Sequence, residues 1–508
     1  PTPTPIDVTN IKIEIANRRP MISAEPVLSG GNRTYTIVFN SNAPVTPALF
    51  DGTDPGAPTN TDMNTEIWTY QFTVPDTVNL AEGADVAFQD LSTGTFTRVT
   101  NTPASRAPLP GSGSQAPFYA DDNREVAISD AGDVIAFVST RDLVPPGNAD
   151  TGQIANPEIF LFNRGTSIFT QATSTITTNN VFPVFNSNPN IAGSGGAFTL
   201  AFSSNANLAT DNNYGGGNGN SEVFVATYNG AAIVGGSTRQ ITKTRDTNQG
   251  VGVLFSVGRR LSRDGRWVAF ETKAESPTAN AATNTDFLVS FICDLESNPT
   301  TCTQVGPRPL AAPGDVPFRF PGFTDYTGTT PGTVIFTSAL NFKSDGTFPT
   351  LDQDNTGLNP ARASQIFATS LPAATTGPFT KLTNIPGAFF FPPINSLPSN
   401  SRRRIAFTLG NAELGGGNAE GSGEVFYNLV PAATTDSTAT ISVFTGASLI
   451  PVAAASPTAS PSGSPSPSPS PSPTGSPGGP LVAPGLAAGE FARITSSASL
   501  APSAGATA

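Results

Sequence analysis

The chain has 508 residues, of which only 13% are charged, and it contains 49 glycines, 48 prolines and no histidine. About a quarter of the residues in an average soluble domain are charged. Ser-His-Asp and Cys-His catalysis are excluded, because both need an imidazole base. Histidine-ligated zinc, copper and haem sites are excluded as well, and two cysteines cannot build a four-cysteine zinc site.

The net charge is −12, so the chain is acidic. Nucleic acids and anionic membranes bind basic patches, so neither is expected as a partner. No stretch of about 18 apolar residues occurs, which argues against membrane insertion. The first residues, Pro1–Pro5, are typical of a processed N-terminus or of an arbitrary boundary. We expect an extracellular or cell-surface protein, with the periplasm as second choice.

In chain order, the first predicted element is the alternating run Asn10–Ala16. It suits the outer strand of a last blade that closes a ring, although it also suits the first repeat or a partner. Six apolar strands ending in Phe follow. They are Thr36–Phe39, Val134–Phe137, Thr199–Phe202, Trp267–Phe270, Thr333–Phe336 and Arg404–Phe407.

Each of these strands is followed by a long loop rich in Asn, Gly and Asp, and then by a second strand. The six second strands are Glu66–Trp68, Glu158–Phe160, Glu222–Phe224, Asp286–Leu288, Gln365–Phe367 and Glu424–Phe426. Successive repeats are about 65–71 residues apart after a longer first interval. A four-stranded blade needs about 40–45 residues, so the surplus lies in loops. The sequence therefore predicts an all-β fold, a six-bladed β-propeller with long loops.

Two turn motifs make a family resemblance specific. Ser129–Ser139 and Ser262–Phe270 each place a turn that contains Ser, Asp and Gly before an Ile/Val-Ala-Phe strand. This pattern resembles the TolB-type, WD-like β-propeller repeat of secreted bacterial proteins, over residues of about 20–445. The resemblance implies a propeller but no particular activity, because such repeats serve many roles.

The two cysteines, Cys293 and Cys302, flank a turn signal at Glu296–Pro299. A hairpin there would place the two thiols on facing strands, so we expect a disulfide and an oxidising compartment. The alternative is that the two residues pack independently in the core.

We expect three segments: a propeller over residues 1–450, a Ser/Pro-rich linker over 451–480 and a tethered strand segment over 481–508. The linker favours an extended polyproline II conformation. Beyond it, the tail run matches the strands that close the blades: Phe491, Ala492, Arg493, Ile494 and Thr495. This tail strand would pair with its own propeller, pair with a neighbouring subunit by strand addition, or begin a further domain.

We find no catalytic motif. The run Gly193–Gly196 does not form Gly-x-Ser-x-Gly, and no histidine would activate its serine. Carboxylates for glycoside chemistry are Asp121 with Asp122, Asp352 with Asp354, and Asp264, the last more simply a turn residue.

Calcium is left open, because none of the oxygen-rich loops has the spacing of an EF-hand. These loops contain Asp51 and Asp54, Asp211–Asn213, and Asp345 with Asp352–Asn355.

We therefore predict no cofactor and no metal site, and a non-enzymatic, secreted structural or protein-interaction scaffold. Its expected partner is itself or another extracellular protein, as in a filament whose subunits are joined by the tail. The alternative is an extracellular propeller that binds a glycan or peptide through its long loops. A hydrolase that uses a pair of carboxylic acids is a third hypothesis.

Overall fold

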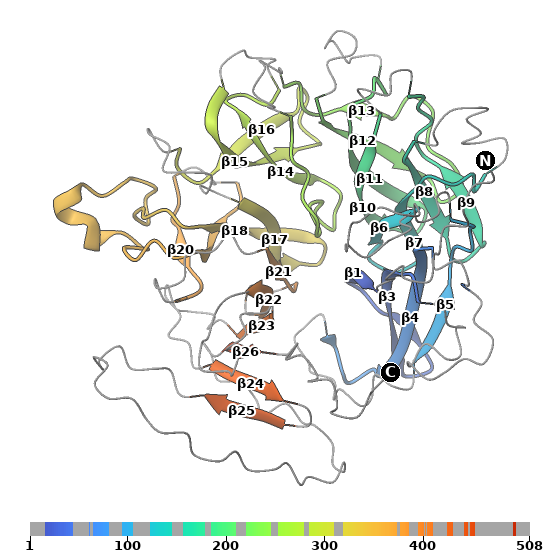
Figure 1. Ribbon diagram of the computed structural model, residues 1–508, viewed down its shortest axis with the longest axis horizontal. Helices are drawn as coiled ribbons and strands as arrows, with labels where there is room; N and C mark the ends of the chain where they lie inside the picture. The colour runs from blue at the N-terminus through green and yellow to red at the C-terminus, as the bar shows by residue number, and fades with distance from the viewer. Residues whose placement is uncertain are drawn as a thin grey trace, which may run out of the picture.

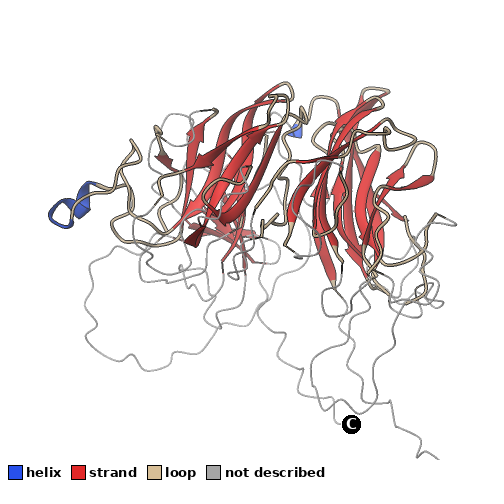
Figure 2. Ribbon diagram, turned by 90° about the horizontal axis from the view of Figure 1, so that it is seen from above, coloured by secondary structure: helices blue, strands red, loops and turns tan. Residues whose placement is uncertain are grey.

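The computed structural model describes residues 16–43, 60, 64–80, 94–104, 122–144, 156–177, 184–209, 220–244, 252–278, 284–308, 319–372, 376–385, 395–400, 402, 404–409, 424–429, 441–445, 448–452 and 491–493. Nearly all of its regular structure is β-strand, and the sheets are arranged around a common centre (Figures 1 and 2). The predicted all-β propeller is confirmed. No helix among these residues is long and apolar enough to cross a membrane.

The first three blades are antiparallel sheets whose strands run outward from the centre in chain order. Blade 1 contains β1 (Asn17–Ile22), β2 (Val27–Ser29), β3 (Asn32–Ser41), β4 (Glu66–Pro75) and β5 (Thr95–Arg98). Blade 2 contains β6 (Asn123–Ile128), β7 (Val134–Ser139), β8 (Glu158–Asn163) and β9 (Ile168–Gln171). Blade 3 contains β10 (Asn186–Ser194), β11 (Ala197–Ser204), β12 (Glu222–Tyr228) and β13 (Arg239–Gln240).

Blades 4 and 5 follow the same plan. Blade 4 contains β14 (Trp267–Ala274), β15 (Asn284–Asp294) and β16 (Thr301–Val305), with single bridges joining Leu254 and Leu261 to β14 on its inner side. Blade 5 contains β17 (Arg319–Thr327), β18 (Thr330–Ser338), β19 (Gln365–Ser370) and β20 (Thr380–Lys381). A 3-10 helix, η4 (Leu351–Thr356), lies between β18 and β19.

The sixth sheet is not a regular blade. Its strand order is β21 (Ser396–Pro398), β22 (Arg404–Leu409), β23 (Glu424–Leu429), β26 (Phe491–Arg493), β24 (Ile441–Thr445) and β25 (Ser448–Val452). The pairing of β24 with β26 is parallel, unlike every pairing in the other sheets. The described residues therefore give five blades, and the predicted count of six is not matched.

In every sheet two aromatic residues face each other across neighbouring strands. These are the second and third strands in the sheet order, except in blade 4, where they are the first and second. The Phe that ends each predicted first strand faces Trp or Phe in register. The pairs are Phe39 with Trp68, Phe137 with Phe160, Phe202 with Phe224, Phe270 with Phe291, Phe336 with Phe367 and Phe407 with Phe426. In blades 2 to 5 the ring centroids lie 5.8–6.1 Å apart. These rings form the centre of the core clusters between blades.

One predicted partner strand is displaced. In blade 4 the sequence suggested Asp286–Leu288, but Phe270 pairs with Phe291, five residues beyond Asp286. The strand β15 is 11 residues long, so it contains both candidates. Register is set by the buried aromatic pair rather than by the first acidic residue of the run.

Adjacent blades are joined by a repeated polar cluster. In blade 2, Glu158 at the start of β8 accepts hydrogen bonds from the Thr175 backbone N at 2.6 Å and from Thr173 Oγ1 at 2.5 Å. Asn186, on the innermost strand of the next blade, donates to Glu158 Oε2 at 3.0 Å. Glu66 and Glu222 occupy the same position in blades 1 and 3.

Blade 5 has an uncharged residue at this position. Gln365 Oε1 accepts from Thr383 Oγ1 at 2.8 Å and from the Ile385 N at 2.9 Å, while its amide donates to the Ile385 carbonyl. The cluster therefore needs the shape and the acceptors of a carboxyl group but not its charge. Consistent with this, burial raises the pKa of Glu66 and of Glu222 to about 7.

A second polar cluster links blades across the centre. Arg259 Nη1 donates to Asp130 Oδ1 at 2.8 Å, and Arg263 Nε donates to Asp130 Oδ2 at 3.1 Å. Arg263 also pairs with Glu25. The side chains of Asp130 and Arg263 are both buried. One carboxylate on the turn after β6 thus holds two arginines from the segment that precedes β14.

We predict that Glu222→Gln makes the protein more stable at pH 8 but not at pH 5. Folding raises the pKa of Glu222 to about 7. Its carboxyl group therefore makes its full contribution to the free energy of unfolding below the pKa of the unfolded state, and that contribution is lost as the pH rises to about 7. The loss is on the order of 3 kcal/mol for a shift of this size. Thermal unfolding at pH 5 and pH 8 measures it, with the exposed Glu296→Gln as control. An unchanged pH dependence in Glu222→Gln would contradict the assignment.

We also predict that Asp130→Asn destabilises the fold by about 3–5 kcal/mol, because it leaves two arginines without their shared carboxylate. The matched control is Asp294→Asn, which breaks the more exposed pair with Arg266 and should cost no more than about 1 kcal/mol. Chemical denaturation compares the two variants. Equal losses of unfolding free energy in the two variants would contradict the prediction.

Candidate binding site

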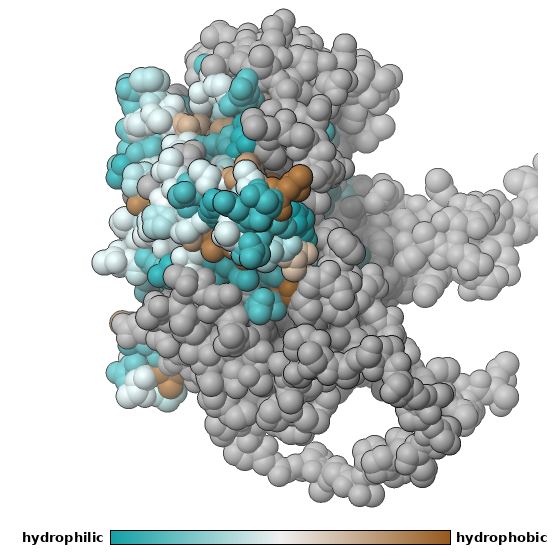
Figure 3. Space-filling model, turned by 90° about the vertical axis from the view of Figure 1, so that its left-hand side faces the viewer, coloured by the Kyte–Doolittle hydropathy of each residue, from teal (hydrophilic) through white to brown (hydrophobic). Residues whose placement is uncertain are grey.

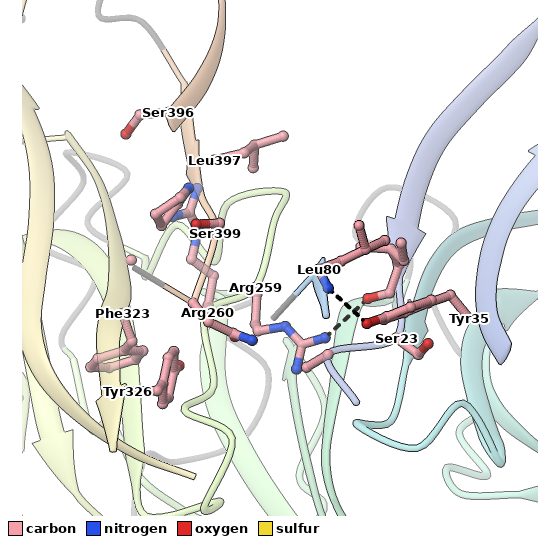
Figure 4. A pocket seen from close by; sticks show the side chains of 15 residues that line it. Ser23, Tyr35, Leu80, Arg259, Arg260, Phe323, Tyr326, Ser396, Leu397 and Ser399 are labelled. Atoms are coloured by element: carbon pink, nitrogen blue, oxygen red, sulfur yellow. Dashed lines mark hydrogen bonds between the residues drawn. The ribbon is translucent and has the colours of Figure 1, made fainter. Parts of the chain in front are cut away.

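The channel between the blades contains a cavity with a volume of about 170 Å³. Figure 4 shows the side chains that line it. They come from the end of β1 and the turn after it (22–24), from Arg259 and Arg260, from β17, and from β21 with the turn that follows (396–400). Segments far apart in the sequence thus meet in one place.

Aromatic side chains line the cavity from two sides. Tyr35 of blade 1 lies on one side, and Phe323 and Tyr326 of blade 5 lie on the other (Figure 4). The Tyr35 hydroxyl accepts a hydrogen bond from the Leu80 N at 3.0 Å, which fixes that ring. Burial raises the pKa of Tyr326 above its usual range, so its hydroxyl is a neutral donor.

One residue that lines the cavity has a buried hydroxyl without a hydrogen-bond partner, Ser396 on β21. Leaving a buried polar group without a partner costs about 1–3 kcal/mol.

Two adjacent arginines border the same cavity. Arg259 is held by Asp130, and its Nη2 also contacts the Ile22 carbonyl oxygen at 3.5 Å. Arg260 is fully buried and donates to the backbone carbonyls of Pro321 and Val257. Burial lowers the pKa of Arg260 to about 10, so its guanidinium is still charged at neutral pH.

The innermost strands share an unusual backbone feature. Four of them carry a non-glycine residue in the left-handed region, with φ between 50° and 58°: Arg19, Glu125, Asn188 and Phe320. Each lies where the strand shifts register against its neighbour. Such bulges redirect side chains. Here Asn188 N donates to Glu125 Oε2 at 2.6 Å and Arg19 Nη1 to Asn188 Oδ1 at 3.3 Å, so these groups satisfy one another.

On the side of the molecule drawn in Figure 3, the described surface is mostly hydrophilic, and its hydrophobic residues occur in small separate groups. The described part of that surface therefore offers no broad apolar docking face.

The two cysteines lie opposite each other on β15 and β16 and form a disulfide. The tail strand β26 pairs antiparallel with β23 of its own chain. Ile494 and Thr495 lie outside the described residues, as do the predicted strand up to residue 15 and the linker over 453–480.

None of the carboxylates considered from sequence lies at the cavity. Asp264 Oδ1 accepts from Ser262 Oγ at 2.5 Å, so it shapes the turn before β14. Asp122 accepts from Thr140, while Asp121 lies outside the described residues. Asp354 pairs with Arg362 at 2.6 Å on the exposed helix η4, which also contains Asp352.

The loops considered as calcium sites lie partly within the described residues. Asp345 accepts from the backbone and hydroxyl groups of Thr347, an ordinary turn. No group of three or more potential metal ligands occurs among the described residues. Asp51, Asp54 and Asp211–Asn213 lie outside them. The run Gly193–Gly196 is the tight hairpin between β10 and β11.

Sequence reasoning missed the residues that line the cavity. Ser396, Tyr326 and Arg260 belong to no motif. The signal that was available is the doubled arginine, Arg18-Arg19 and Arg259-Arg260, in a chain with only 26 basic residues. Both pairs lie on inner segments that precede a buried strand.

Comparison with known proteins finds no matching family model and no matching curated protein. Solved structures do match. An α-L-arabinofuranosidase of Fusarium graminearum is 10% identical, with 81% of this chain and 91% of that chain covered and a TM-score of 0.34. An α-L-arabinanase of Penicillium chrysogenum is 11% identical, with 80% of this chain and 94% of that chain covered and a TM-score of 0.33. Prolyl oligopeptidase B of Galerina marginata is 9% identical, with 81% of this chain and 49% of that chain covered and a TM-score of 0.34.

These comparisons correct three expectations. The TolB-type resemblance is wrong as a family assignment, because no family model matches the chain and the described residues give five blades. Its motif is explained locally: Ser129 and Ser262 each bond an Asp of their own turn. The expectations of a non-enzymatic scaffold or filament subunit, and of no enzyme, are withdrawn, because no comparison supports them. At this distance no residue, activity or substrate is transferred from the solved structures.

Proposed function

We propose that the protein is a glycan-binding propeller that holds one sugar residue in the cavity of its channel. The observation that carries the proposal is a cavity lined by aromatic rings from blades 1 and 5 and by Ser396, whose buried hydroxyl has no partner. Sugars present apolar ring faces and many hydroxyls, so they match both features. Pockets for drug-sized ligands have volumes of about 300–1,000 Å³. The cavity is smaller, at about 170 Å³, which favours a single sugar ring.

The proposal includes two further points. We propose that the sixth sheet completes the ring as a sixth blade, because β21 supplies part of the cavity wall. We also propose a secreted protein, since its one disulfide favours an oxidising compartment.

The test is the variant Ser396→Ala. It removes a buried hydroxyl that has no partner, so the free protein should be as stable as before or more so. Binding of the glycan should weaken by between about twofold and about tenfold, the effect of one hydrogen bond of about 0.5–1.5 kcal/mol. Calorimetric titration with pentose and hexose oligosaccharides measures the affinity, and thermal unfolding measures the stability.

The matched control is Ser370→Ala, which changes an exposed serine of β19 away from the cavity. It should alter neither affinity nor stability. An affinity that is unchanged in Ser396→Ala would place the glycan elsewhere. The absence of binding across neutral and acidic oligosaccharides would overturn the proposal.

A further inference from the structure

The guanidinium of Arg260 is buried without a counter-ion. It is only 1% exposed. Its hydrogen bonds go to the carbonyl oxygens of Ser256, Pro321 and Val257, at 3.4, 2.5 and 2.7 Å, and to Asn395 Oδ1 at 3.2 Å. All four acceptors are neutral, and among the described residues no carboxylate pairs with Arg260 within 4.0 Å.

The nearby carboxylates are engaged elsewhere. Glu271 pairs with Arg319 and accepts from the Phe320 N at 2.6 Å. Asp130 holds Arg259 and Arg263. Burying a charge is costly unless it is paired, so the partner of Arg260 is expected to come from outside the chain.

Arg260 borders the cavity together with the unpartnered hydroxyl of Ser396. An arginine has five N–H donors, of which these four bonds leave one unused. A ligand with an anionic oxygen at this point would accept from the guanidinium. Charge-assisted hydrogen bonds of this kind are about twice as strong as neutral ones.

The charge balance favours a single negative charge. Around the cavity and the cluster beside it, four arginines face three carboxylates: Arg259, Arg260, Arg263 and Arg319 against Glu25, Asp130 and Glu271. A carboxylate would neutralise the remaining charge. A phosphate or sulfate dianion would exceed it.

We propose that the cavity binds a carboxylate-bearing sugar, a uronic acid, whose carboxylate pairs with Arg260. This inference rests on the proposed glycan binding and names the class of glycan.

The test compares uronic acid trimers with the same trimers after methyl esterification, which removes only the charge. Calorimetric titration of the full chain at pH 7 uses galacturonate, glucuronate and mannuronate trimers. At least one acid should bind tenfold or more tighter than its ester, and the difference should shrink as salt is added. Esters that bind as tightly as the acids would overturn the carboxylate while leaving glycan binding intact. If neither form binds, the proposed function itself fails.

The variant Asn395→Asp sharpens the test. It places a carboxylate where the Asn395 amide oxygen lies 3.2 Å from Arg260 Nη2, and it removes the hydrogen bond of the amide to the Val257 carbonyl at 3.4 Å. The protein then carries its own counter-ion, so the preference for acid over ester should fall at least fivefold. The control is Asn32→Asp on β3, which adds the same charge at an exposed position outside the cavity lining.

A preference that survives in Asn395→Asp as in Asn32→Asp would overturn the role of Arg260. A sugar phosphate that binds tighter than the best uronic acid would overturn the charge argument. N-acetylaspartate binding as tightly as the best uronic acid would overturn the assignment to a sugar.

Discussion

The cross-strand aromatic pair at the centre of each sheet is the contact on which the rest of the molecule depends. It recurs in register in each sheet, and in blades 2 to 5 the rings lie close to parallel or in shallow tilt. In blades 1 to 5 each pair buries a large apolar area and fixes the register of its blade, because a slip of one residue would turn one of the two rings toward the opposite face. With register fixed, the innermost strands and their bulges are brought to the channel.

Polar groups then join what the aromatic pairs build. Carboxyl groups at Glu66, Glu158 and Glu222, and the amide of Gln365, accept hydrogen bonds from threonines of their own blade. In blades 1 and 2 an asparagine of the next blade completes the cluster. The interchange of Glu and Gln explains how a chain with few charges seals its blades: the clusters rely on hydrogen bonding, and burial disfavours ionisation.

The channel is organised differently, because its charged side chains form ion pairs with one another. Asp130 holds two arginines, and Glu271 holds a third. Within this paired set, Arg260 keeps only neutral partners, and the hydroxyl of Ser396 has none. A fold optimised for stability alone would satisfy or remove both groups, and both residues line the cavity to which we assign glycan binding.

The sequence by itself determined the all-β class, the six strands that end in Phe and the facing positions of Cys293 and Cys302. These follow from local patterns, since alternation, turn residues and short spacing act within one hairpin. It also excluded chemistry that needs histidine. Only the tertiary structure decided that Ser396, Tyr326 and Arg260 share a cavity, because innermost strands of different blades meet through ring geometry. The same reason explains the displaced register in blade 4 and the irregular sixth sheet: long-range packing selects among local patterns that fit equally well.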